Sequence, residues 1–246
     1  MVYSKRFYRD GLCPAGMTSF QVSVKETDLW IALEEEFFRE ELLQEIEQFV
    51  WEQRRCLEKY IGHTPHFAES MSPFLADQNA PPLAREMARA GNRAGVGPMA
   101  SVAGAFAQWT GKWLLQRSRQ VIVENGGDIF YYSYHSLKVG VFAGKSLFSG
   151  RLSLILEPRS EPRGICTSSG SVGPSYSQGR ADAAIIVASD ALLADAVATA
   201  TANIIQREGD LEKSLEMAKI MPEVSGALAI LGDKMAAWGD IQLEQA

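Results

Sequence analysis

The stretch "ADAAIIVASDALLADAVATATAN" (residues 181–203) joins a short apolar run to a long alanine-rich one. Its first part, "ADAAIIVAS", is typical of a short buried strand. Its second part has the apolar spacing of a helix, and either Ser189 or Asp190 can accept hydrogen bonds from the first turn of that helix. The sequence therefore predicts a buried strand that leads directly into a helix.

The polar residues of this helix are unusual. Asp195 and Thr199 are four residues apart, so at roughly 100° per residue they project from the same face. An apolar stripe, expected to face the core, consists of Leu193, Val197, Ala200 and Ile204. A second stripe consists of Asp195, Thr199, Ala202 and Gln206. A water-exposed stripe usually carries Lys, Glu or Arg, yet the only charged residues between positions 183 and 206 are Asp190 and Asp195.

Two interpretations of this pair of residues stay open. A carboxylate and a hydroxyl one turn apart, among alanines that let another element approach, are hard oxygen ligands of the type that Mg²⁺ accepts beside waters, carbonyls and phosphates. A buried polar pair whose hydrogen bonds are satisfied by the protein has the same pattern. Asp195 and Thr199 are therefore candidates for either a metal or phosphate site or a structural pair.

Length and composition limit the class of protein. With 246 residues, 46% of them hydrophobic, the chain can bury a substantial core, and we expect one domain over residues 1–246. The net charge is −6 and no dense Lys/Arg run occurs, which argues against a nucleic-acid partner. The three cysteines, Cys13, Cys56 and Cys166, lie far apart and form no CxxC motif, which argues against a disulfide framework or a structural zinc.

The chain shows no sign of a targeting or membrane segment. Charges run through its first ten residues, no apolar stretch precedes Cys13, and no apolar run approaches the roughly 20 residues that span a bilayer. We therefore expect a cytoplasmic protein without a membrane partner. The sequence does not indicate its oligomeric state.

The first half of the chain predicts mainly helices. "SFQVSVKETDLWIAL" (19–33) alternates on both sides of KETD, which indicates two strands and a hairpin. A long core-packing helix is expected over residues 34–60, followed by a proline-bearing connection over 61–82. "PLAREMARAG" (82–91) and "PMASVAGAFAQWTGKWLLQRS" (98–118) indicate two helices joined by a glycine-rich loop.

The second half predicts mainly strands. From residue 119, the runs RQVIVEN, DIFYYSY, LKVGVFA and RLSLILEP indicate an antiparallel meander. "DLEKSLEMAK" (210–219) indicates a short helix, and "GALAILGDKMAAWGDIQLE" (226–244) a closing hairpin. Because strands and helices do not alternate as βαβ units, we expect an α+β fold in which helices pack on an antiparallel sheet.

Tandem glycines mark a second candidate site in "VENGGDIF" (123–130). Gly126 and Gly127 suit a tight turn with positive φ. They equally suit close approach of a ligand to the bare backbone, with Asp128 accepting hydrogen bonds from the ligand's hydroxyl or amine groups.

A third candidate is the loop "TSSGSVGPSYS" (167–177), which holds six Ser or Thr hydroxyls. Such a loop, beginning Thr167, Ser168, Ser169 and Gly170, can surround phosphate oxygens with hydroxyl and backbone N–H donors. A solvated linker has the same composition.

Three motifs, "NGGDI", "CTSSGS" and "VASDALLADAVATATAN", resemble in the same order three motifs of the ApbE-like superfamily, whose type members are FAD:protein FMN transferases. The resemblance covers roughly residues 90–205 and is greatest to a short cytoplasmic branch whose function is not established. It implies a T-fold-like α+β domain that binds Mg²⁺ and FAD or a related pyrophosphate. Asp195 and Thr199 would hold the metal. "GVGPMASVAGAFA" (95–107) resembles the "GAIAKGYA"-type segment, which makes Ala100 the counterpart of the residue whose carbonyl joins the metal. The implied nucleotide-binding residues are Gly126, Gly127, Asp128, Thr167, Ser168, Ser169 and Gly170.

The chain departs from the transferases at two places. Gly170 is followed by SVGPSYSQGRAD, which has no counterpart of their "HxxDPxTG"-type segment, and Ser101 lies near the place of the "AKGYA"-type lysine. Loss of a cation beside a pyrophosphate weakens phosphate binding or transition-state stabilisation. The preferred hypothesis is therefore a protein that binds a nucleotide without transferring it. A Mg²⁺-dependent FMN transferase or FAD-processing enzyme is one alternative, and a structural or interaction protein without a ligand is another.

Overall fold

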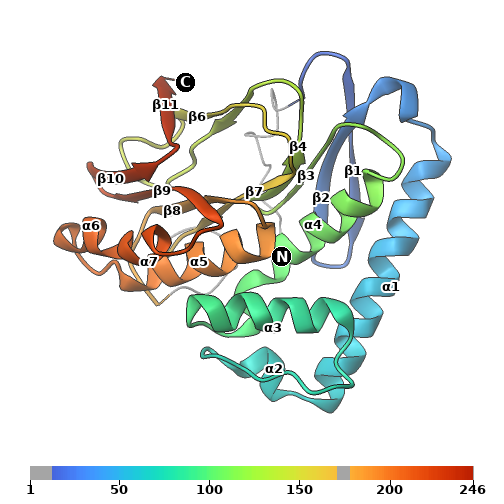
Figure 1. The fold of residues 1–246 in the computed structure, drawn as a ribbon, viewed down its shortest axis with the longest axis horizontal. Helices are drawn as coiled ribbons and strands as arrows, with labels where there is room; N and C mark the ends of the chain where they lie inside the picture. Colours follow the sequence, from blue (N-terminus) through green and yellow to red (C-terminus); the bar gives the residue numbers. More distant parts are fainter. Residues whose placement is uncertain (1–12, 171–177, 246) are drawn as a thin grey trace.

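Two antiparallel sheets and a layer of helices make up the fold (Figure 1). The computed structural model describes residues 13–170 and 178–245. Within these residues, eight strands form one sheet in the order β1-β2-β3-β4-β7-β8-β9-β10. Their bounds are Met17–Val24 (β1), Thr27–Glu34 (β2), Val121–Asn125 (β3), Asp128–Tyr132 (β4), Arg163–Ser168 (β7), Ala183–Ala188 (β8), Val224–Leu231 (β9) and Lys234–Gly239 (β10).

A smaller sheet covers part of one face of the large one. It has the order β11-β6-β5, with bounds Gln242–Gln245, Leu152–Leu156 and Leu137–Gly140. Helices cover the other face (Figure 1). The longer ones are Glu41–His63 (α1), Pro82–Ala94 (α3), Val102–Leu114 (α4) and Ala191–Ile204 (α5), and the single turns are His66–Glu69 (α2), Leu211–Ser214 (α6) and Glu216–Lys219 (α7). The architecture is the α+β arrangement that the sequence predicts.

The strand β8 shows how the three layers are packed. All six of its residues are buried. Ala184 and Ile186 belong to the apolar core under the helices, whereas Ile185 and Val187 belong to the core between the two sheets. Because successive side chains of a strand point to opposite faces, a strand that is covered on both sides must be apolar throughout. The prediction of a buried strand here is confirmed.

The helix α5 is buried on more sides than its expected core stripe. Leu193 and Val197 are buried as expected, but so are Asp195 and Ala202 of the second stripe, since that stripe packs against other elements. The inference that this stripe does not face water is therefore confirmed at those two positions. The assignment is wrong at the end of each stripe: Ile204 is partly exposed, and residue 206 lies beyond the helix, in water.

The first hairpin is confirmed, with β1 and β2 joined by a turn at residues 25–26. The prediction that the following helix begins at residue 34 is wrong. Residues Glu35–Phe37 form a separate 3₁₀ turn, and α1 begins only at Glu41. Negative charges suit a helix N-terminus, but the charge pattern alone does not say which acidic residue begins the helix.

The expected meander is divided between the two sheets. β3 and β4 pair in the large sheet, whereas β5 and β6 pair in the small one. The closing hairpin consists of β9 and β10, and the chain then continues into β11, which pairs with β6 as the third strand of the small sheet. The serine-rich stretch from residue 167 begins as the end of a strand and not as a loop, since β7 runs to Ser168. Residues 210–219 form the two single turns α6 and α7 in place of one helix.

In the described ranges, no helix combines the length and apolar character needed to cross a membrane. All three cysteines carry free thiols.

Candidate functional site

The turn between β3 and β4 is built on the tandem glycines. Asn125 pairs with Asp128, which leaves Gly126 and Gly127 as a two-residue turn with φ of 72° and 103°. The backbone N–H of Gly127 donates to a carboxylate oxygen of Glu124, at 2.7 Å. The turn interpretation is confirmed, because side chains other than hydrogen are strained at such φ values.

Asp128 begins β4 with its side chain in the interior. It is 6% exposed, and its Oδ1 atom is buried with no hydrogen-bond partner among the described residues. Burial raises the pKa of this carboxyl well above its usual value, and the nearby carboxylates of Asp195 and Glu124 act in the same direction. Hydrogen bonding from Cys166 and from the backbone N–H of Thr167 opposes the rise. A carboxylate here is therefore short of positive partners.

Asp195, on α5, lies beside Asp128, and its side chain reaches the first turn of α4. Its Oδ2 atom accepts a hydrogen bond from the backbone N–H of Gly104, at 2.9 Å. The N-cap residue of α4, Ser101, makes no side-chain cap, so the carboxylate of α5 supplies one from another helix. Burial raises the pKa of Asp195 to about 7, although the N–H groups of Gly104 and Ala103 lower it.

A glycine permits this contact between α4 and α5. A Cβ atom on Gly104 would lie 2.4 Å from the carbonyl oxygen of Ala191 and 3.0 Å from the Cβ of Asp195. The hairpin is tied to the same turn, since Asn125 Nδ2 donates to the carbonyl of Ala103 at 3.1 Å. The two candidate sites marked by Gly127 and by Asp195 are thus parts of one region.

The other expected metal ligands lie on adjoining elements. Thr199 is half-buried one turn after Asp195, and Ala100 is half-buried in the 3₁₀ turn Pro98–Ser101, which packs on α5. Ser101 is buried, and its hydroxyl donates to the carbonyls of Pro98 and Met87. It therefore fixes the 3₁₀ turn and brings no positive charge to the region.

The described part of the serine-rich loop adjoins the hairpin at one residue. A Cβ atom on Gly127 would lie 3.9 Å from the Cβ of Thr167. Ser168 is buried at the end of β7, while the Ser169 hydroxyl and the Gly170 N–H donate to the carbonyl of Ala181, at 3.2 and 2.9 Å. The rest of the loop, residues 171–177, lies outside the described residues.

The arrangement suits a metal that completes its shell with oxygens other than carboxylates. Among residues 13–170 and 178–245, no three His, Cys, Asp or Glu side chains are grouped so as to hold a metal. Mg²⁺ is commonly held by one or two carboxylates together with waters and substrate phosphates. The buried, unpartnered oxygen of Asp128 beside Asp195 fits such a cation, since a positive charge there would offset two buried negative ones.

Sequence reasoning missed three residues of this region: Gly104, Glu124 and Cys166. The thiol of Cys166 is fully buried beside Asp128, and burial together with the two aspartates raises its pKa well above the usual value. The one available signal was a glycine inside an otherwise favourable helix, "VAGAFA", which indicates a close approach of another element. Glu124 and Cys166 occupy ordinary strand positions and gave no signal.

Solved structures with the same fold are flavin transferases and their relatives. The apo form of the Pseudomonas stutzeri flavinyl transferase ApbE matches with a TM-score of 0.56 at 12% identity, over 91% of this chain and 94% of that one. The ApbE protein of Thermotoga maritima matches with a TM-score of 0.57 at 13% identity, over 89% and 96% of the two chains. At these identities the similarity shows the fold, which is ApbE-like.

Sequence comparison gives more similar relatives. A UPF0280 protein of Methanosarcina barkeri is 40% identical over 190 residues, which are 76% of this chain and 75% of the relative. A UPF0280 protein of Methanospirillum hungatei is 37% identical over 220 residues, which are 89% and 86% of the two chains. The model of the family described as AbpE bacteria matches residues 10–225. The chain therefore belongs to the AbpE bacteria family, as a relative of the UPF0280 proteins and with a distant resemblance to the ApbE flavin transferases.

Proposed function

We propose that this protein binds a flavin nucleotide such as FAD, or a related pyrophosphate, together with Mg²⁺. The observation that carries the proposal is the buried pair of carboxylates, Asp128 and Asp195, of which Asp128 has one oxygen without a hydrogen-bond partner in the described part of the chain. Uncompensated buried charge is costly, so a site of this kind is most stable when a cation or a proton occupies it.

The metal would be held by the Asp195 carboxylate, the Thr199 hydroxyl and the Ala100 carbonyl. When bound, Mg²⁺ would supply positive charge to the phosphate groups of the ligand. Asp195 would serve two elements, because its Oδ2 atom already caps the first turn of α4. The carboxylate is thereby fixed in place before any ligand binds, which lowers the entropic cost of binding.

The nucleotide would lie against the β3–β4 turn and the start of the serine-rich loop. Gly126 and Gly127 leave bare backbone at the turn, and Thr167 lies next to it. Ser168, Ser169 and Gly170 are buried or bonded to the protein backbone, so their proposed part is to shape the loop. Asp128, the last assigned residue, is buried, so its proposed part is that of the carboxylate beside Asp195.

Binding is favoured over covalent transfer. The sequence after Gly170 lacks the segment that the transferases carry, and Ser101 makes hydrogen bonds to backbone carbonyls where they have a lysine. The two buried carboxylates support cation binding, whereas the missing lysine would have stabilised a developing negative charge during transfer.

Titration of Mg²⁺ into the metal-free protein tests the site. Asp195→Asn keeps the shape of the side chain and removes its charge, so Mg²⁺ affinity, measured by isothermal titration calorimetry, should fall at least about tenfold. Asp233→Asn is the matched control, because Asp233 is exposed on the β9–β10 turn and its change should leave the affinity unaltered. Unchanged Mg²⁺ affinity in Asp195→Asn, combined with a lower melting temperature of the metal-free protein, would assign Asp195 to helix capping alone.

A further inference from the structure

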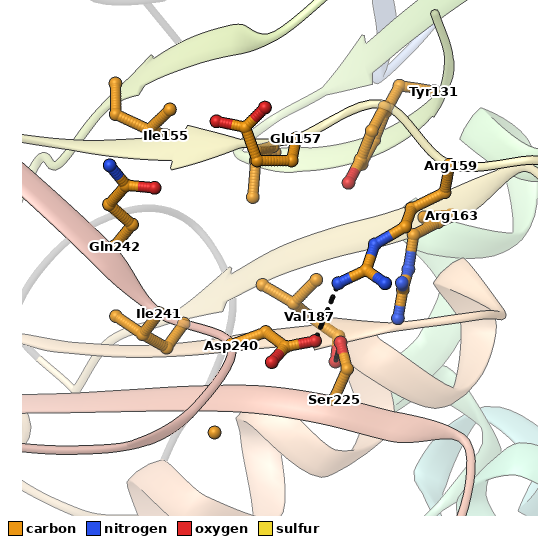
Figure 2. Close-up of a pocket in the computed structure, with 12 residues that line it drawn as sticks. Tyr131, Ile155, Glu157, Arg159, Arg163, Val187, Ser225, Asp240, Ile241 and Gln242 are labelled. Carbon is orange, nitrogen blue, oxygen red and sulfur yellow. Dashed lines mark hydrogen bonds and ion pairs between the residues drawn. The ribbon is translucent and has the colours of Figure 1, made fainter.

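A polar pocket of about 270 Å³ lies between the two sheets, on the side of the large sheet away from α5 (Figure 2). Its walls come from β4, β7, β8, β9 and β10 of the large sheet and from β6 and the start of β11 of the small one. None of the residues assigned to the Mg²⁺ or nucleotide site lines it. Alternation along β4 explains the separation: Phe130 belongs to the core under the helices, whereas Tyr131 belongs to the core between the sheets.

An arginine without an ion pair is the central feature of this pocket. Arg163 on β7 lies directly opposite Tyr131 on β4 in the antiparallel register, so both side chains point to the pocket side of the sheet. The Nε atom of Arg163 is buried and has no hydrogen-bond partner, and among the described residues no carboxylate lies within ion-pair distance of its guanidinium. A guanidinium in this state presents several unused donors, which match the geometry of phosphate or carboxylate oxygens.

Two further donors lie on the same side. Figure 2 shows the Tyr131 hydroxyl directed toward the guanidinium groups of Arg159 and Arg163. Burial raises the pKa of Tyr131 to about 12, so the phenol keeps its proton and can donate. Arg159 is held by Asp240 at 2.8 Å, an exposed pair that leaves other N–H groups of the guanidinium unused.

The acidic residues of the pocket do not neutralise Arg163. Asp240 is paired with Arg159, and the carboxylate of Glu157 accepts a hydrogen bond from Ser136 at 3.0 Å. In Figure 2 the Glu157 carboxylate points away from the two arginines. The positive charge of Arg163 is therefore not neutralised by either of these carboxylates, and Arg163 lines the cavity.

We propose that this pocket is a second ligand site, which binds a small oxyanion of the phosphate or phosphomonoester class between Arg163, Tyr131 and Arg159. Its volume of about 270 Å³ holds a phosphate with a short organic group, and it lies just below the range of about 300–1,000 Å³ that is typical of pockets for drug-sized ligands. The proposal does not rest on the Mg²⁺ site, which lies on the other face of the sheet.

Calorimetric titration of the full chain with inorganic phosphate, in the presence of EDTA, tests the site without contribution from Mg²⁺. We expect saturable binding that Arg163→Gln weakens at least about tenfold and Tyr131→Phe weakens by a smaller factor. Arg55→Gln is the matched control: it removes the same charge from an exposed position on α1, beyond the opposite face of the sheet, and should leave phosphate affinity unchanged. Asp195→Asn should also leave it unchanged.

Titration with phenyl phosphate and with acetate identifies the class of oxyanion. Tighter binding of phenyl phosphate than of acetate supports the proposal, and the reverse order would replace phosphate with a carboxylate ligand. Absence of phosphate binding to the wild-type chain, or equal affinity in Arg163→Gln and Arg55→Gln, would overturn the site. Circular dichroism checks that each variant is folded. If Arg163→Gln does not fold, Arg163→Lys replaces it: this variant keeps the charge and should bind phosphate more weakly than the wild type but still measurably.

Discussion

At the scale of single residues, Asp195 joins two roles that the sequence presented as alternatives. Its carboxylate caps α4 through Gly104, which is a structural role. It also lies beside Asp128, with no positively charged partner among residues 13–170 and 178–245, which is the condition of a cation site. A capped helix N-terminus carries only partial positive charge. Capping therefore offsets part of the cost of burying Asp195 and leaves room for a metal.

The pH dependence of stability should show this uncompensated charge. In the unfolded chain Asp195 has its ordinary pKa, near 3.8, whereas in the fold its pKa is about 7. Between these values the folded state keeps a proton that the unfolded state has lost, so the free energy of unfolding falls as the pH rises through this window. Each pKa unit corresponds to about 1.4 kcal/mol. Urea unfolding in EDTA should therefore give lower stability at about pH 8 than at about pH 5.

Two variants separate this effect from general charge repulsion. Asp195→Asn should reduce the pH dependence and leave the part that comes from the buried Asp128, whereas Asp233→Asn, at an exposed turn, should leave the full dependence intact. Added Mg²⁺ should restore stability to the wild-type chain at the higher pH. A wild-type profile that rises steadily from about pH 5 to 8 in EDTA would contradict the account of the buried pair.

The chemistry of Asp195 was visible in the sequence, but its partners were not. An aspartate among alanines, in a helix with almost no other charge, indicates a special environment. Gly104 is 91 positions away along the chain, and Asp128 reaches the same place only because β4 is an interior strand of the sheet. Such long-range contacts depend on topology, which residue patterns specify only weakly.

At the scale of elements, the β3–β4 turn determines where Asp128 lies. Gly127→Val should cost roughly 1–3 kcal/mol of stability, because φ is 103° there and a β-branched residue is strained at positive φ. The matched control is Gly62→Ala in α1, where φ is not positive and a Cβ meets nothing within 4 Å, so stability should stay level or rise. Chemical denaturation measures the free energy of unfolding of both variants. Equal stability of Gly127→Val and the wild type would show that residue 127 does not need a positive φ.

The contact between α4 and α5 gives a second prediction at this scale. Gly104→Ala places a methyl group 2.4 Å from the carbonyl oxygen of Ala191, so the helices must separate at the point where Asp195 caps α4. We expect a loss of about 1–3 kcal/mol in thermal or chemical denaturation, which is typical of overpacking. Mg²⁺ affinity should fall as well, since the position of Asp195 depends on this contact. A stable Gly104→Ala variant with unchanged Mg²⁺ affinity would contradict the role given to the contact.

Patterns within elements were predictable, whereas their assignment to sheets was not. Alternation identified β3, β4, β5 and β6 as strands, and β8 as a buried one. That β5 and β6 leave the large sheet depends on a pairing with β11, about 90 residues further along the chain. The strand β7 was hidden because its last residues, Thr167 and Ser168, have the composition of a loop.

At the scale of the whole molecule, one sheet separates two proposed sites. Asp195 lies on the helix side, and Arg163 lies between the sheets. Effects of Asp195→Asn on Mg²⁺ binding and of Arg163→Gln on phosphate binding should therefore be independent, as is usual for distant residues without shared partners. That residues 1–246 form one domain, and that the protein is cytoplasmic, remain predictions of the sequence.

Covalent flavin transfer is expected to be negligible. Incubation of the protein with FAD, Mg²⁺ and a threonine-bearing acceptor domain should give little or no flavinylated product, because the segment after Gly170 and the lysine near Ser101 are both missing. In-gel flavin fluorescence of the acceptor measures the product. Efficient transfer would replace the binding function with that of a Mg²⁺-dependent FMN transferase.

A flavin nucleotide that binds through Mg²⁺ at Asp195 should lose affinity when the metal is removed. Calorimetric titration of the wild-type chain with FAD, once in excess Mg²⁺ and once in EDTA, measures this loss. We predict saturable binding in Mg²⁺, with affinity at least about tenfold lower in EDTA, and no such difference in Asp195→Asn. Absence of FAD binding in both conditions, or equal affinity in Mg²⁺ and EDTA, would show that the protein does not bind FAD through Mg²⁺.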